Sequence, residues 1–463
     1  MNTNENVAEM VENPRMALFK MAIPTFVSFG CILLNLFFDS IWVSGLGNVE
    51  VSVVGITSFI FNLLIIIGTG IGTTVNVSLS KSIAAKDIEE SNSLIKNILL
   101  VILGLSILIP LIVLPFLDKI LALFCTNQIF DASYSYLSIL VCFIGFFFVL
   151  DILPFLLRLQ GYIKIPIVII VITSGINMVL DPIFIYSFNW GIKGAAMATV
   201  CSVIIGSIIL FAVLLIKRNE YISIGEYNYN RKRDLKVLKK NIRIGVPVIL
   251  QSALTTFFSI LINNFFLYEG LIYITAYSFT NKLMAFALLP LNAFSSAMIS
   301  VIGFLIGAKH WDDITPNLKY AFFVVEVITI IPSIFAFFGS DFLSYVLYQT
   351  KDMLVINQIS LSIKFFAILN IVQNACLLVD AMFISIEKPE KSFYLLLIGT
   401  VLTFGAMYVM EYWLHIVNSV YYVLIVVSIV QIVIYYYMFR KDLNEFLDRK
   451  RNEKEINEDA ELD

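Results

Sequence analysis

Long apolar runs separated by short polar breaks dominate the chain. A helix needs about 20 apolar residues to cross the hydrocarbon core of a bilayer, so runs of that length predict membrane spans. Twelve such runs lie at residues 17–43, 51–79, 94–117, 134–157, 166–188, 194–216, 242–267, 272–304, 319–339, 358–386, 393–413 and 418–439. The more polar stretch 80–93 is expected to be an amphipathic segment at the membrane surface. The pattern predicts an all-α polytopic membrane protein.

The positions of lysine and arginine predict how the chain is oriented, because loops rich in these residues stay on the cytoplasmic side. With the N-terminus inside, 26 of the 31 lysines and arginines fall in inner loops or terminal segments. Lys119, Lys193 and Lys351 fall outside, whereas Lys282 and Lys364 lie within apolar runs. We therefore expect a multi-pass protein of the cell (plasma) membrane with both termini in the cytoplasm.

The longest inner loop divides the chain into two halves of six spans. It carries nine lysines and arginines and lies between the sixth and seventh runs. The predicted organisation is an N-lobe, a cytoplasmic linker, a C-lobe and a cytoplasmic tail, at residues 1–216, 217–241, 242–440 and 441–463.

The two halves share an internal repeat. At one constant offset of 223 residues, Pro24, Lys86 and Pro166 recur as Pro247, Lys309 and Pro389. An even number of spans makes both copies enter the membrane from the same side, which predicts parallel repeats related by a pseudo-twofold axis along the membrane normal. Two six-helix bundles related in this way leave a cleft that can open to alternate sides, which is typical of a transporter.

The composition supports a membrane protein and excludes several other classes. The chain is 59% hydrophobic and 14% charged, whereas a soluble domain is about 45–50% apolar and about 25% charged. A net charge of −3 offers no basic surface for nucleic acid. With two histidines, five cysteines without a CxxC pair, and no HExxH, GxSxG or phosphate-loop motif, we expect neither an enzyme nor a cofactor.

Carboxylates within the apolar runs of the first half are candidates for a binding site, because a charge at mid-bilayer costs about 2.5–3.5 kcal/mol on insertion scales. Asn177 and Asp181 are four residues apart, so a helix places them on one face. Asp39 lies at a comparable depth in the first run. Such oxygen ligands suit Na⁺ or a shared proton. Alternatively, these residues bind neighbouring helices together, and Asp151 pairs with Arg158.

Charged residues also lie in the apolar runs of the second half. Lys282, Glu326 and Asp380, together with Lys364, predict either a polar chamber or a set of internal ion pairs.

These residues resemble the multidrug and toxic compound extrusion (MATE) family of the MOP superfamily. The resemblance covers about residues 13–440 and rests on NPRMALFKMAIP, with Asp39 fifteen residues after Pro24, and on NMVLDPIFIYSFNWGIKGAAMAT. It implies a first-lobe cation site of Asp39, Asn177, Asp181 and Thr199, and a bend of the first helix at Pro24. Thr255 and Asn374 depart from the NorM-like branch, so the DinF-like pattern of first-lobe coupling fits better.

The expected function is therefore antiport of Na⁺ or H⁺ against amphipathic, cationic organic compounds by a monomer in the bilayer. The alternative within the same superfamily is a flippase for lipid-linked saccharides, which Lys282 and Lys364 favour.

Overall fold

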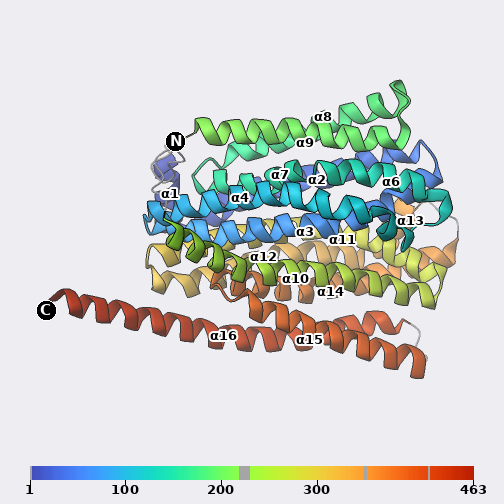
Figure 1. Cartoon of the computed structure of the whole chain (residues 1–463). Helices are drawn as coiled ribbons and strands as arrows, with labels where there is room; N and C mark the ends of the chain where they lie inside the picture. Colours follow the sequence, from blue (N-terminus) through green and yellow to red (C-terminus); the bar gives the residue numbers. More distant parts are fainter. Residues whose placement is uncertain (1–2, 218–229, 349–351, 415–417, 463) are drawn as a thin grey trace. The chain divides into compact units, whose positions relative to one another are not determined.

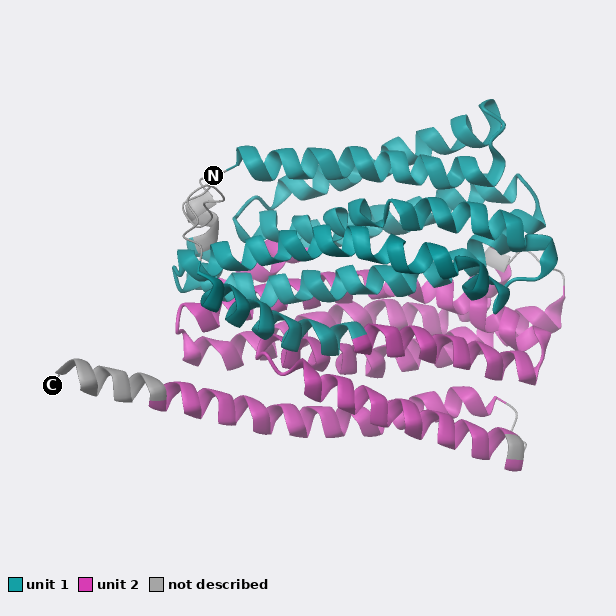
Figure 2. Cartoon of the chain, in the orientation of Figure 1, with its two compact units in different colours: residues 1–12, 23–249 teal, residues 13–22, 250–463 magenta. Residues whose placement is uncertain are grey.

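The computed structural model describes residues 3–217, 230–348, 352–414 and 418–462, and within these ranges all regular structure is helical. The chain divides into two compact units (Figure 2). Unit 1 contains residues 1–12 and 23–249, and unit 2 contains residues 13–22 and 250–463. Within each unit, long helices lie side by side in a bundle (Figure 1). The predicted all-α fold is confirmed.

Unit 1 holds the helices of the first half. They are α1 (Thr3–Glu12), most of α2 (Pro14–Ser44), α3 (Asn48–Ala84), α4 (Ile88–Val113), η1 (Leu114–Phe116), α5 (Leu117–Ala122), α6 (Asn127–Cys142), α7 (Ile144–Leu159), α8 (Lys164–Pro182), η2 (Ile183–Ser187), α9 (Gly191–Ile216) and the first part of α10 (Arg231–Glu269). Helix α4 has a capped start, because the Asp87 carboxylate accepts the backbone N–H of Glu90 at 2.8 Å. Helices α6 and α7 meet at a bend of 51°.

Unit 2 holds the rest of α10 and the helices of the second half. They are α11 (Leu271–Gly307), α12 (Trp311–Phe338), α13 (Ser340–Tyr348), α14 (Met353–Ser385), α15 (Pro389–Tyr408), η3 (Val409–Trp413) and α16 (Ser419–Leu462). Stacked aromatic rings fill part of its core: the ring centroid of Phe266 lies 4.6 Å from that of Tyr277 and 4.9 Å from that of Tyr421.

The helices agree with the predicted spans. Eleven described helices are long and apolar enough to cross a membrane, and the bent pair α6 and α7 makes twelve when it counts as one span. Large apolar side chains on these helices remain exposed, among them Leu111 at 68% and Phe335 at 74%. Lipid is the solvent in which such a surface is stable.

The internal repeat is visible in the helix boundaries. Helices α3 and α11 begin and end 223 residues apart, at the offset of the sequence repeat. Each begins after a glycine with positive φ, Gly47 at 136° and Gly270 at 138°. Each is followed by a lysine whose backbone is in the left-handed region, with φ of 55° at Lys86 and 61° at Lys309. Both halves therefore use the same connection between their second and third spans.

Two helices change unit along their length. The first turns of α2, within residues 13–22, belong to unit 2, although the rest of the helix belongs to unit 1. Conversely, residues 231–249 of α10 belong to unit 1 and the remainder to unit 2. Pro24 and Pro247 lie within two residues of these two changes. Both helices continue through their proline.

The stretch 80–93, which was expected to lie on the membrane surface, is instead the end of α3 and the start of α4. Its serines are buried, and the Ser91 hydroxyl donates to that of Ser82 at 2.9 Å. The amphipathic pattern arises because these polar side chains pair between the two helices. Helix α10 likewise begins at Arg231, within the predicted linker, and α16 extends through most of the predicted tail.

Candidate cation-binding site

Two carboxyl groups of unit 1 meet inside the helix bundle. Asp181 and Asn177 on α8 are each 1% exposed, and the Asn177 amide donates to Asp181 Oδ1 at 3.4 Å. Asp39 on α2 lies close enough to Asp181 for the two carboxyl groups to interact electrostatically. The structure thus brings together three of the four residues expected to form the cation site.

Three oxygen atoms at this point are buried without a hydrogen-bond partner. They are Oδ1 of Asp39, Oδ1 of Asn177 and Oδ2 of Asp181. Ionised carboxylates only accept hydrogen bonds, so neither aspartate can satisfy the other without a proton between them. Buried polar atoms are normally paired, and these three oxygens are available to accept a hydrogen bond or to bind a positive ion. A monovalent cation or a proton has the required charge and preference for oxygen.

The end of α8 holds Asp181 in place. Pro182 ends the α-helical hydrogen bonding, and the chain continues directly into the π-turn η2. Helix α9 packs tightly on this turn at Gly194, where an added Cβ would lie 2.6 Å from the carbonyl carbon and oxygen of Phe184. The close approach of α9 therefore fixes the turn that follows the aspartate.

Tyr136 on α6 is part of this environment, and sequence reasoning did not find it. The side chain is 8% exposed and lies close enough to Asp39 and Asp181 to interact electrostatically with both. A phenolic hydroxyl can donate to a carboxylate or accept from a bound proton carrier.

Thr199 and Pro24 have other local partners. The Thr199 hydroxyl donates to the carbonyl of Ala195 within α9 at 3.0 Å. Its part in a cation site stays a prediction. The carbonyl of Pro24 accepts the Ser28 hydroxyl at 3.1 Å, inside a helix that runs without interruption from Pro14 to Ser44. A bend at Pro24 likewise stays a prediction.

Asp151 and Arg158 interact electrostatically, but each has a closer polar partner. The hydroxyl of Thr69 lies 3.4 Å from Asp151 Oδ2. The Arg158 guanidinium donates to the Thr25 hydroxyl of α2 and stacks on the ring of Phe155 at 4.6 Å. This cation therefore joins α7 to α2.

In unit 2, two of the three residues predicted to form a polar chamber gather around one cysteine. Cys376 lies close enough to Glu326 and Asp380 to interact electrostatically with both. The Asp380 carboxylate accepts the Ser392 hydroxyl, whereas Oε1 of Glu326 is buried without a partner. Lys282 is exposed, and no described interaction joins it to these acids.

The other predicted cation of the second half pairs with an acid of a neighbouring helix. The Lys364 ammonium is 3.5 Å from the carboxylate of Asp341, an exposed residue of α13. The hydrogen bond from Ser360 and the charge of Lys364 hold the pKa of Asp341 below its usual value.

Among the described residues, no group of three or more histidine, cysteine, aspartate or glutamate side chains could hold a metal ion.

Comparisons with known proteins agree with this arrangement. The model of the MatE family matches residues 24–183 and 247–409, once in each half. The multidrug export protein MepA of Staphylococcus aureus strain MSSA476 is 25% identical over 289 residues. That alignment covers 61% of this chain and 62% of MepA, so the chain matches less than two thirds of this relative's length.

Solved structures show the same fold. A MOP superfamily transporter from Pyrococcus furiosus, described as having a binding pocket of reverse polarity, superposes with a TM-score of 0.89 at 22% identity, covering 96% of this chain and 99% of that one. A MATE structure in the straight conformation gives a TM-score of 0.88 at 22% identity, with coverage of 95% and 98%. The predicted two-lobe, twelve-span architecture is thus the one these structures share.

Proposed function

Because this chain belongs to the MatE family, whose model matches both of its halves, we propose that it exports an organic compound in exchange for Na⁺ or H⁺. It is a multi-pass membrane protein and a transporter rather than an enzyme. The proposed cargo is an amphipathic, cationic small molecule, in keeping with the name of the multidrug export relative. The proposed working form is a monomer in the cell membrane with both termini in the cytoplasm.

The observation that carries the proposal is the set of unpartnered oxygens on Asp39, Asn177 and Asp181. Two of the three belong to carboxylates that lie close enough to interact electrostatically. Such a pair repels when both groups are ionised, so a proton or Na⁺ between them relieves the repulsion. The two carboxylates and Asn177 form the proposed binding site of the coupling ion, and Thr199 is its proposed fourth ligand.

Ion binding drives export only if the ion favours one conformation over another. A ligand shifts an equilibrium by the difference between its affinities for the two states and by no more. Asp39 is on α2 and Asp181 is on α8, so any relative movement of these two helices changes the distance between the carboxylates. We therefore propose that the ion stabilises the state in which α2 and α8 hold the carboxylates together.

Transport assays on purified protein in proteoliposomes test this proposal. A Na⁺ gradient and a pH gradient are imposed separately, with a fluorescent organic cation as cargo. Gradient-driven export should fall at least tenfold in Asp39→Asn and in Asp181→Asn. Asp131→Asn, which neutralises an exposed carboxylate of the same unit, should transport like the wild type.

Ion binding can be measured without transport. A ligand that binds the folded state at 100 times its Kd stabilises that state by about 2.7 kcal/mol. The wild type should therefore unfold at a higher temperature in saturating Na⁺, or at a pH that protonates the site, and Asp181→Asn should lose that response. An Asp39→Asn, Asp181→Asn double variant that still exports at the wild-type rate refutes the proposal.

The flippase alternative has less support from the described contacts. It depends on cations within the membrane segments, and one of the two candidates, Lys364, is paired with Asp341. Tight, saturable binding of a pyrophosphate-linked lipid, unaffected by Asp181→Asn, would favour the flippase over the antiporter.

A further inference from the structure

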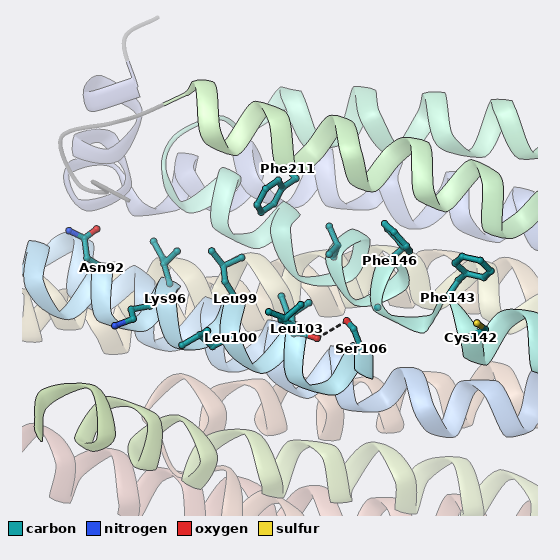
Figure 3. A pocket seen from close by; sticks show the side chains of 14 residues that line it. Asn92, Lys96, Leu99, Leu100, Leu103, Ser106, Cys142, Phe143, Phe146 and Phe211 are labelled. Carbon is teal, nitrogen blue, oxygen red and sulfur yellow. Dashed lines mark hydrogen bonds between the residues drawn. The ribbon is translucent and has the colours of Figure 1, made fainter. Parts of the chain in front are cut away.

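Unit 1 carries an apolar groove that shares no lining residue with the carboxylate site. Its volume is about 570 Å³, within the range of about 300–1,000 Å³ that is usual for small-molecule sites. Its walls come from α4, from the junction of α6 and α7, and from α9 (Figure 3). They include Leu99, Leu103, Phe143, Phe146, Val149 and Phe211.

The bend between α6 and α7 lies along the groove. Phe143 lies at the bend of 51°, which directs α7 away from the line of α6. The Phe146 carbonyl accepts the Ser207 hydroxyl at 2.7 Å, which ties the start of α7 to α9. At Gly145, an added Cβ would collide with the Ser106 side chain of α4. Gly145 thus lets α4 and α7 approach each other closely along the groove.

The α4 wall between Lys96 and Ser106 is about as long as one leaflet of a bilayer. Along α4 the lining residues run from Asn92 and Lys96 to Ser106. Ten residues of helix from Lys96 to Ser106 span about 15 Å. The hydrocarbon core of a bilayer is about 30 Å thick, so each leaflet contributes about 15 Å. Ser106 is near the middle of the predicted span 94–117, so this part of the groove falls near the bilayer midplane.

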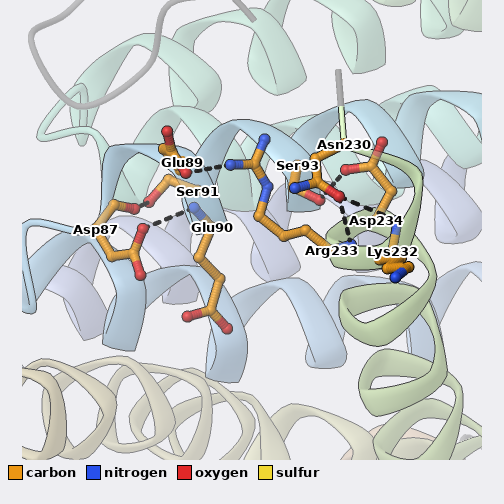
Figure 4. Close-up of polar contacts among 9 residues, drawn as sticks. All are labelled: Asp87, Glu89, Glu90, Ser91, Ser93, Asn230, Lys232, Arg233 and Asp234. Atoms are coloured by element: carbon orange, nitrogen blue, oxygen red, sulfur yellow. Dashed lines mark hydrogen bonds and ion pairs between the residues drawn. The ribbon is translucent and has the colours of Figure 1, made fainter. Parts of the chain in front are cut away.

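The end of the groove at Asn92 and Lys96 is polar. The carbon chain of Lys96 lines the groove, and its ammonium lies 3.4 Å from the carboxylate of Asp234 on α10. That aspartate also accepts the Ser93 hydroxyl at 2.6 Å, which places the start of α10 against α4 (Figure 4). Exposed Lys217 directly follows the last residue of α9, the opposite wall.

Residues of both charges surround this contact, and Glu89 of α4 pairs with Arg233 of α10. Arg231 and Lys232 begin α10, and no ion pair among the described residues involves either of them. Within the described part of the chain, no acidic side chain lines the groove itself. Basic residues at the predicted cytoplasmic end of membrane helices attract anionic lipid headgroups.

We propose that this groove binds one acyl chain of an anionic phospholipid from the inner leaflet, with the headgroup held at Lys96 and Lys217. The apolar walls take the chain, and the two lysines select the charge of the headgroup. This inference does not depend on the proposed transport activity.

Native mass spectrometry of the full chain, purified in detergent and exposed to equal amounts of phosphatidylglycerol and phosphatidylcholine, tests the site. The wild type should retain one phosphatidylglycerol at a detergent concentration that removes bulk lipid. Val149→Trp and Leu103→Trp fill the groove from opposite walls, and each should lower the retained lipid at least tenfold. Ile107→Trp, a 62% exposed position on α4 beyond the groove, should retain it.

A separate variant tests the proposed contact of the lipid headgroup with the two lysines. Lys96→Gln with Lys217→Gln should still bind a chain but should lose at least a threefold preference for phosphatidylglycerol over phosphatidylcholine. Folding of every variant is checked by its unfolding temperature. A folded Val149→Trp or Leu103→Trp protein that retains lipid like the wild type overturns the site, and an unchanged preference in the lysine variant overturns the headgroup contact.

Discussion

Replacing Gly194 by alanine tests how the end of α8 is held. An added Cβ would lie 2.6 Å from the Phe184 carbonyl carbon and oxygen and 2.9 Å from the Ile185 nitrogen, whereas ordinary contacts begin at 3.4 Å. The obstructing atoms belong to the backbone and cannot rotate away. Helix α9 and η2 must therefore separate by about 0.8 Å, the difference between 3.4 Å and 2.6 Å. Such overpacking typically costs about 1–3 kcal/mol.

The expected change in unfolding temperature follows from this cost. For a unit of about 150–250 residues, 1 kcal/mol shifts Tm by about 2–4 °C, so Gly194→Ala should lower Tm by about 2–12 °C. The measurement is thermal unfolding in detergent, followed with a thiol-reactive dye, because the five cysteines are free. The proposed stabilisation by a bound ion should decrease as well, since η2 directly follows the Asp181–Pro182 pair.

Gly175→Ala is the matched control. Gly175 lies on α8 two residues before Asn177, and an added Cβ there would meet nothing within 4 Å. Alanine is also the better helix former, so this variant should unfold at the wild-type temperature or slightly above it. If Gly194→Ala unfolds at the same temperature as Gly175→Ala and keeps its response to the ion, the contact of α9 with η2 does not hold the site.

Two further outcomes follow from ion pairs in unit 2. Asp442→Asn removes the buried carboxylate that Lys388 and Lys391 share, and it should lower the stability by about 1.5–3 kcal/mol in the same unfolding assay. If Asp442→Asn has the Tm of the wild type, the two ion pairs with Lys388 and Lys391 do not stabilise the fold. Because the pKa of Asp341 is held below 3.8, its stabilising contribution is complete at neutral pH and is lost as the pH falls below about 4. Asp341→Asn should therefore flatten the decrease of Tm in that acidic range, and an unchanged acid profile would contradict the interaction.

The sequence was most informative where the cause is local. Spans were predictable because a helix in lipid needs a long apolar run and must satisfy its own backbone. The contact of Asn177 with Asp181 follows from a spacing of four residues on one helix. The meeting of Asp39 with Asp181 involves two helices, and only their similar depth and the family resemblance pointed to it.

Other features depend on packing that spacing does not encode. Tyr136 is one of 21 tyrosines, and nothing in the sequence near it marks a partner on α2 or α8. Lys282 lies in an apolar run, yet the rotation of α11 leaves its side chain exposed instead of near Glu326. The polar stretch 80–93 was misread because serines buried between two helices give the same pattern as a face exposed to water.

The two helices that change unit have a consequence for biogenesis. Unit 1 includes residues 231–249, so it is incomplete until the ribosome has synthesised well past the ninth helix. Unit 2 in turn uses the stretch 13–22, which leaves the ribosome before any of its other parts. Neither half can complete its own packing as a separate translation product. Two fragments divided between α9 and α10 should each be degraded when expressed alone, and should rescue one another when made in the same cell.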